Sequence, residues 1–233
     1  MRSFPLPALF VPASRFCLSL AGVAILTSCA AIEKRAEEKR LAAEQAEALA
    51  THAAWRAEPR WRAKTFRNDA LLQKLTPENP SVQIALADQR GILLVGGCVA
   101  MDFPVATGKK SHPTPAGDYK ILGKQRDYSS NLYGKIVDPA GVVLVADADT
   151  RADIPAEGAS FVGAKMPFWM RLNNSGVGMH VGYVPGRPAS HGCIRLRRET
   201  AQFLFESLPV GTPVVIASQA PALDQPSDAP RKP

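Results

Sequence analysis

The sequence predicts a mainly β domain that follows an N-terminal helical segment. From Val82 onwards, apolar residues stand at every second position or in short runs divided by Gly and Pro, which is typical of strands and loops. The stretch from Ala30 to Glu58 contains neither Gly nor Pro and is rich in Ala, Glu, Lys and Arg, which favours a helix. Hydrophobic residues make up 46% of the 233, enough for a folded core.

Residues 1–28 have the features of a secretory signal. Arg2 and Arg15 precede an apolar run from Phe16 to Leu26, and this run is too short to span a bilayer. The run ends in LTSC, which resembles the lipobox of bacterial lipoproteins, where the cysteine carries the lipid. We therefore expect Cys29 to be the membrane anchor. Ala30 resembles the residue after the lipidated cysteine in lipoproteins of the outer membrane, so we expect a periplasmic protein held there. A plain secretory signal is the alternative.

Residues 29–80 are expected to form a helical spacer and linker. The helix that begins at Ala30 should end before Pro59, and at 1.5 Å per residue it is roughly 40 Å long. Its apolar residues are mostly alanine, so the stripe is too thin to predict a coiled coil. The helix would hold the following domain away from a membrane. Self-association through an alanine-rich seam is the alternative.

The domain at 81–217 is expected to be rich in sheet. Val82, Ile84 and Leu86 alternate with polar or small residues. Further strands are predicted at GILLVGG, DYKIL, GVVLVAD, FWMRL and TPVVIA.

One helix is predicted late in this domain, from about Arg198 to Leu208, because apolar residues recur there at helical spacing. The tail at 218–233 is rich in Pro and is expected to be disordered.

The net charge does not demand a nucleic acid partner. It is +7, of which Arg2 and Arg15 supply two, so +5 remains after removal of the signal. The basic residues are spread along the chain and form no recognisable nucleic-acid module, so we expect no nucleic acid partner. A polymer with free carboxylates suits the charge equally well.

The four cysteines divide by position. Cys17 leaves with the signal and Cys29 takes lipid, so Cys98 and Cys193 remain in the folded domain, too few for a disulfide framework. Cys98 follows an apolar run and is expected to pack as a small apolar side chain. A disulfide between Cys98 and Cys193 stays open in an oxidising compartment.

Two short motifs, GMHVG and ASHGCIRL, place chemistry-bearing residues close together. Cys193 is a candidate nucleophile, since a nearby imidazole lowers a thiol's pKa and holds the ion pair. His191 lies two residues before it, and residues i and i+2 of an extended chain point to the same side. His180 precedes a loop rich in Gly and Pro that can bring strand ends together. Gly192 leaves the main chain open, so amides there can receive an oxyanion.

Three other interpretations of Cys193 stay open. A zinc site would use Cys193, His191 and His180, but the other candidate ligands show no paired spacing. Those candidates are Cys98, His112 and His52. An inert buried thiol and an inactive binding module are the remaining alternatives. We expect neither a metal nor a cofactor.

The string SHGCIRL with an upstream histidine resembles the L,D-transpeptidases, the YkuD-type catalytic domain of cell-wall enzymes. ADQRG, FPVATGKKSHPTPAGDYKIL and MHVGYVPGRPASHGCIRL look like that family's segments and occur in its order. The resemblance implies a YkuD-like β-sandwich with Cys193 as the acylated nucleophile and His180 as the general base. It also implies that the Val181 carbonyl orients the base, and that His191 and Gly192 line the oxyanion with Cys193.

The resemblance further implies attack on the bond between meso-diaminopimelate and D-alanine in a peptidoglycan tetrapeptide stem. A second diaminopimelate, a protein lysine or water would then accept the acyl group, which bears on cell-wall organisation and cell shape. A non-catalytic peptidoglycan-binding lipoprotein is the alternative from another class. Many members have glycine where this chain has Val181. The stretch from His180 to Cys193 is also short, and whether this widens the cleft or changes the acceptor stays open. The oligomeric state also stays open.

Weaker expectations concern substrate contacts. Arg195 and Arg187 are candidates to bind the carboxylates of the stem peptide. Tyr183 is expected in the cleft, Ser190 is expected to support the site through its hydroxyl or contact substrate, and Trp169 is expected in the core.

Overall fold

The computed structural model describes residues 19–219, with side chains from residue 30 onwards. The expected signal at 1–28 lies partly outside these residues, as does most of the tail at 218–233, and the side chain of Cys29 is not described. The chain divides into two compact units, residues 1–46 and 47–233. Within the described residues, no helix is both long enough and apolar enough to cross a membrane.

Helix α1 spans Ser19–Arg56, so it begins inside the expected signal and ends close to its predicted limit. From Ala30 to Leu41 its side chains are exposed. Its last turns, from Glu47, belong to the second unit, where Ala48 is buried. The segment is therefore not a spacer along its whole length, because its end packs on the β domain.

An ion network fixes the end of α1. His52 Nε2 lies 2.7 Å from Asp102 Oδ2, and Arg56 and Arg90 each contact the same carboxylate at 2.7 Å. Burial alone would raise the pKa of Asp102, but the hydrogen bond to His52 and the two guanidinium charges hold that pKa below its usual range. The carboxylate therefore stays charged although it is fully buried.

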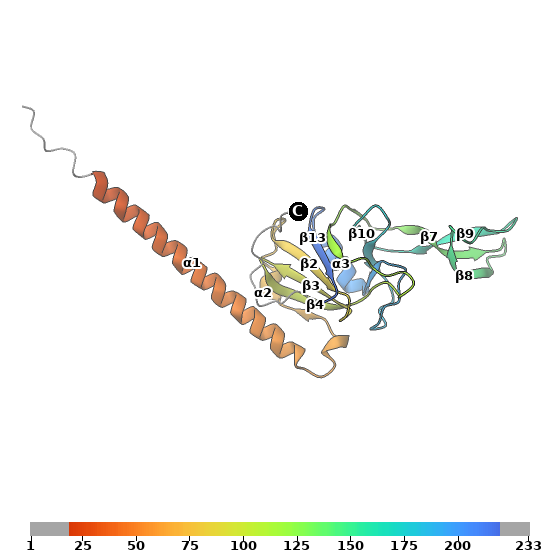
Figure 1. Cartoon of the computed structure of the whole chain (residues 1–233), viewed down its shortest axis with the longest axis horizontal. Helices are drawn as coiled ribbons and strands as arrows, with labels where there is room; N and C mark the ends of the chain where they lie inside the picture. The colour runs from red at the N-terminus through yellow and green to blue at the C-terminus, as the bar shows by residue number, and fades with distance from the viewer. Residues whose placement is uncertain (1–18, 220–233) are drawn as a thin grey trace, which may run out of the picture. The chain divides into compact units, whose positions relative to one another are not determined.

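Ten strands form one sheet, in the order β5-β13-β2-β3-β4-β12-β11-β10-β6, with β1 paired on β4. Its strands β13, β2, β3 and β4 lie side by side in Figure 1. The strands are β1 Phe66–Arg67, β2 Pro80–Ala85, β3 Arg90–Val95, β4 Cys98–Ala106, β5 Gly117–Lys120, β6 Gly123–Gln125, β10 Trp169–Arg171, β11 Gly178–Val181, β12 Ile194–Leu196 and β13 Pro213–Ala217. The mainly β class predicted from sequence is confirmed, and a strand lies at each predicted run.

The central strands β3 and β4 are buried throughout, because both faces of the sheet are covered there. One face contributes to the main core with α3, Arg198–Ser207, whose Ala201 and Leu204 are fully buried. The other face packs on Phe66 and on Trp55 of α1. The helix predicted at 198–208 is confirmed. Two shorter helical segments are η1, Trp61–Ala63, and α2, Asp69–Leu72.

A second sheet has three strands in the order β8-β7-β9, and only β8 was predicted. The bounds are β7 Ser129–Val137, β8 Val143–Asp149 and β9 Ser160–Lys165. Gly134 faces Gly163 across β7 and β9, and a Cβ on Gly134 would meet the carbonyl oxygen of Val162 at 2.2 Å. Small residues thus allow these two backbones to approach closely, and the same residues weaken the strand pattern in the sequence.

Candidate active site

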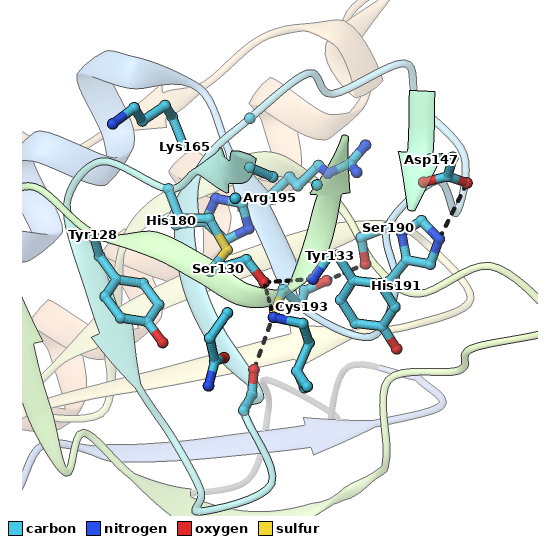
Figure 2. A pocket seen from close by; sticks show the side chains of 18 of the residues that line it. Tyr128, Ser130, Tyr133, Asp147, Lys165, His180, Ser190, His191, Cys193 and Arg195 are labelled. Atoms are coloured by element: carbon cyan, nitrogen blue, oxygen red, sulfur yellow. Dashed lines mark hydrogen bonds and ion pairs between the residues drawn. The ribbon is translucent and has the colours of Figure 1, made fainter. Parts of the chain in front are cut away.

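The parallel pairing of β11 with β12 brings the two motifs together. His180 is the register partner of Arg195, and Met179 is the partner of Ile194. Because side chains alternate along a strand, Met179 and Ile194 both enter the core, where they are fully buried. His180 and Arg195 therefore share the opposite face. Cys193 directly precedes β12 and lies two residues before Arg195, and all three line one pocket (Figure 2).

Cys193 is a free thiol, so the structure contains no disulfide between it and the buried Cys98. Its Sγ lies 3.4 Å from the carbonyl oxygen of Gly176. Burial raises the pKa of the Cys193 thiol, although a backbone contact from Gly178 and the charge of Arg195 offset part of that rise. The thiol is the favoured form in this structure.

His180 is 6% exposed, and its Nδ1 lies 2.8 Å from the Val181 carbonyl oxygen. A carbonyl oxygen only accepts, so Nδ1 carries the proton of the neutral ring and Nε2 is the acceptor. This is the carbonyl that the resemblance implied. The pKa of His180 is lowered to about 4: burial is the largest cause, the hydrogen bond to Val181 opposes the shift, and the Arg195 charge adds to it. The His180 imidazole is therefore neutral at pH 7.

The ion pair that we expected between Cys193 and a histidine is not favoured here. Burial raises the pKa of the thiol and lowers that of the imidazole, so each group prefers its neutral form. Removing both side chains from water penalises the charged forms more than the surrounding groups compensate. The site therefore holds a neutral thiol and a neutral imidazole rather than a preformed ion pair.

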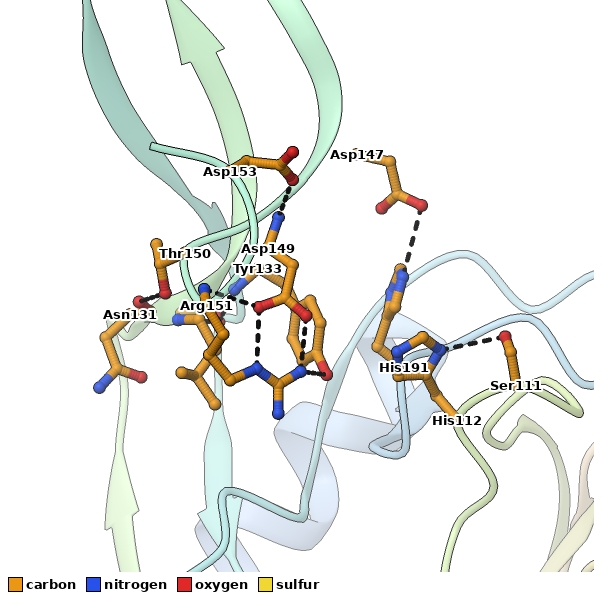
Figure 3. Close-up of polar contacts among 12 residues, drawn as sticks. Ser111, His112, Asn131, Tyr133, Asp147, Asp149, Thr150, Arg151, Asp153 and His191 are labelled. Carbon is orange, nitrogen blue, oxygen red and sulfur yellow. Dashed lines mark hydrogen bonds and ion pairs between the residues drawn. The ribbon is translucent and has the colours of Figure 1, made fainter. Parts of the chain in front are cut away.

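His191 contacts the three-stranded sheet. Residues 191–193 bend, with φ +111° at Gly192, so the argument from an extended chain does not hold. The His191 ring stacks on Tyr133 with centroids 4.5 Å apart and lies edge-on to His112 at 4.9 Å (Figure 3). Its Nε2 is 3.4 Å from Asp147 Oδ2. His191 thus joins the catalytic turn to the three-stranded sheet.

Tyr133 is itself held in place beside that histidine. Arg151 Nη2 donates to the Tyr133 hydroxyl at 2.6 Å and also contacts Asp149 at 2.6 Å (Figure 3). Hydrogen bonds from Arg151 lower the pKa of Asp149 to about 2. This pair fixes the aromatic surface on which the imidazole stacks.

The turn at Ser190 to Cys193 is held by its own hydrogen bonds. Ser190 is 1% exposed, its hydroxyl donates to the Cys193 carbonyl and it accepts from the Gly192 amide at 3.1 Å. Ser190 thus supports the turn from the pocket wall, with both hydroxyl roles used inside the turn. Two amides, those of Gly192 and Cys193, were expected to bind an oxyanion. The Gly192 N–H is used within the turn, so the Cys193 N–H remains as the candidate.

The remaining predicted residues differ in position. Arg195 and Tyr183 line the pocket, and Tyr183 is 78% exposed. Arg187 is exposed and is not among the residues that line the pocket, so the structure does not bring it to the site. Trp169 is buried as expected, yet its ring lies 5.9 Å from that of His180.

The sequence analysis missed the wall that the three-stranded sheet gives the pocket, which has a volume of about 690 Å³. This wall includes Tyr128, Ser130, Tyr133, Lys135, Asp147, Arg151 and Lys165 (Figure 2). The apolar run GVVLVAD predicted strand β8. It contains no signal that this strand would lie beside the pocket of Cys193. Among the described residues, no group of three or more His, Cys, Asp or Glu side chains is placed to hold a metal ion.

The site therefore combines a partly buried thiol, a neutral imidazole oriented by a carbonyl, and a cationic side chain that line one pocket. Comparison with known proteins assigns the family. The model of the YkuD L,D-transpeptidase catalytic domain matches residues 79–216, more than half of the chain. The chain belongs to this family.

Two relatives come from Mycobacterium tuberculosis. Probable L,D-transpeptidase 3 is 27% identical over 122 residues, which cover 49% of this chain and 38% of the relative. L,D-transpeptidase 1 is 27% identical over 128 residues, covering 52% and 43%. The chain thus matches less than half the length of these relatives.

Solved structures with similarity to this chain include an L,D-transpeptidase from Mycobacterium smegmatis. It is 19% identical with a TM-score of 0.47, and the match covers 60% of this chain and 58% of that one. The LD transpeptidase LdtMt1 in complex with imipenem is 20% identical with a TM-score of 0.45, covering 60% and 59%.

The Arg195 charge lowers the pKa of both Cys193 and His180, which gives a first prediction. Arg195→Gln should raise both pKa values, so alkylation of Cys193 at neutral pH should slow and its pH midpoint should move upwards. Iodoacetamide alkylation followed against pH by intact mass measures this shift. Arg187→Gln is the matched control and should leave the midpoint unchanged. An unmoved midpoint in Arg195→Gln would show that this charge does not act on the thiol.

Proposed function

We propose that this protein is a peptidoglycan L,D-transpeptidase that works through an acyl-enzyme on Cys193. The observation that carries the proposal is the shared face of β11 and β12, on which the thiol of Cys193 and the acceptor Nε2 of His180 line one pocket. Membership of the family supports the reaction class.

In the first half-reaction, the thiol proton of Cys193 passes to His180 Nε2 while Sγ bonds to the carbonyl carbon of meso-diaminopimelate. The oxyanion that forms is received by the Cys193 amide. Collapse of this intermediate breaks the bond to D-alanine, whose amine takes the proton from Nε2. D-alanine leaves and a thioester remains on Sγ.

In the second half-reaction, an acceptor attacks the thioester carbon and gives its proton to Nε2; the bond to Sγ breaks, and the thiolate that leaves takes this proton back as the thiol. An amine of a second diaminopimelate yields a 3→3 cross-link, and a protein lysine yields a protein attached to the wall. Water yields a carboxypeptidase product. The alternative of a non-catalytic peptidoglycan-binding lipoprotein needs none of these steps.

The charge of the pocket suits the proposed donor. Lys135, Lys165 and Arg195 line it, with Asp147 as the one carboxylate among its described lining residues. Stem peptides carry free carboxylates, which cationic side chains bind. Arg195 and the exposed Tyr183 are the predicted residues that remain as substrate contacts.

The muropeptides of the producing cell test the proposed activity. Strains with the wild-type protein should contain 3→3 cross-linked, protein-linked or shortened stems that are absent when Cys193→Ala replaces it, because the variant cannot form the thioester. Mass spectrometry of digested cell wall identifies which product forms. Cys98→Ala is the matched thiol control and should resemble wild type. Identical profiles for wild type and Cys193→Ala would favour the binding lipoprotein.

We further propose that Cys29 carries lipid and holds the protein in the periplasm at the outer membrane, on the strength of the LTSC motif. Cys29→Ser should then appear in the soluble fraction instead of the membrane fraction. Metabolic labelling with a fatty acid should mark the wild type and not the variant. An unlabelled wild-type protein would leave only a simple secreted form.

A further inference from the structure

Thr114 lies behind the catalytic turn and does not line the pocket. It is 5% exposed, in the loop between β4 and β5, with a proline on either side. Its hydroxyl accepts from the Gly108 N–H at 2.8 Å and donates to the Gly192 carbonyl at 2.8 Å. The hydroxyl therefore uses both its donor and its acceptor, and it joins this loop to the residue just before the nucleophile.

The Gly192 carbonyl shares one peptide unit with the N–H of Cys193. The described chain contains no cis peptide bond, so in this planar unit the N–H points opposite to the C=O. A bond that fixes the carbonyl toward Thr114 thereby fixes the direction of the Cys193 N–H. The φ of +111° at Gly192 is a conformation that other residues rarely adopt but glycine adopts readily, so glycine permits this turn and hydrogen bonds select it.

The neighbouring peptide groups are held by a different hydroxyl. Ser190 accepts from the Gly192 N–H and donates to the Cys193 carbonyl. Two hydroxyls thus bond three of the four backbone N–H and C=O groups of Gly192 and Cys193. The fourth is the Cys193 N–H, which belongs to the peptide unit that the Thr114 bond holds.

We propose that Thr114 is a positioning residue for acyl transfer: its hydroxyl directs the Cys193 N–H at the oxyanion that forms when Sγ attacks a carbonyl. This inference rests on the proposed function. An oxyanion donor acts only if it is already aimed at the place where charge develops, and loss of one such donor slows reactions by about 10²- to 10³-fold. Thr114 touches no reacting atom and acts through the Gly192 peptide.

Two reactions at the same sulfur separate this role from simple support of the fold. Imipenem acylates a thiol through a tetrahedral oxyanion, whereas iodoacetamide is displaced at a saturated carbon and forms none. Thr114→Val keeps the shape and removes the hydroxyl. Acylation of Cys193 by imipenem should fall by ~10- to 100-fold, while alkylation should stay within about 2-fold of wild type at each pH.

Two further variants control the experiment. Thr114→Ser keeps the hydroxyl and should restore acylation. Thr212→Val removes a hydroxyl that is equally buried and bonded to the Pro209 carbonyl at 2.8 Å, and it should leave both rates unchanged. If thermal unfolding shows that Thr114→Val is not folded, Thr114→Ala takes its place with the same expected ratio of the two rates.

The outcomes separate this inference from the proposed function. Equal losses of acylation and alkylation in Thr114→Val would show that the hydroxyl only keeps the turn folded, and an unchanged acylation rate would show that it has no role. Both outcomes overturn the inference and leave the proposed function standing. A wild-type protein that iodoacetamide alkylates and imipenem does not acylate would remove the proposed function and this inference with it.

Discussion

The parallel pairing of β11 with β12 is the constraint on which the site depends. In this register Met179, Ile194 and Leu196 are fully buried in the core. His180 and Arg195, which alternate with them along the two strands, line the pocket. A slip of one residue would exchange the two faces, placing His180 or Arg195 among apolar side chains and Met179 at the surface. The cost of burying those polar groups selects the register that unites thiol and imidazole. Core packing and catalytic geometry are thus set by the same pairing.

Burial that stabilises this register also determines the protonation states. His180 is buried and Cys193 is partly buried, which favours the neutral imidazole and the neutral thiol over the ion pair. In a neutral pair, little thiolate is present before the reaction. The rate of acylation then depends on proton transfer to Nε2 and on donors aimed at the oxyanion. In our proposal, the hydrogen bonds of Ser190, at the pocket wall, and of Thr114, behind it, hold the peptide groups around Gly192 for that second requirement.

The parts of this account that the sequence predicted are those with local signals. Alternating apolar residues located β2, and helical spacing located α3. The packing of the end of α1 on the β domain was not predicted, because it depends on the contact of His52 with Asp102, fifty residues further along the chain. The alanine-rich sequence of the helix contains no local signal for such a contact. The contacts of His191 escaped prediction for a similar reason: its stacking partner Tyr133 lies on β7, a strand with a weak pattern. The resemblance implied His180 as the base although His191 is nearer to Cys193 in sequence, and in the structure His191 contacts the second sheet.

The central claim is that His180 is the base of a neutral pair, and the rate at which imipenem acylates Cys193 tests it most directly. In His180→Ala the rate at neutral pH should fall by roughly 10²- to 10⁴-fold, and the deficit should shrink as rising pH converts the thiol to thiolate, which needs no base. His191→Ala should lose much less and show no such recovery. A large loss confined to His191→Ala, with His180→Ala close to wild type at every pH, would contradict the account.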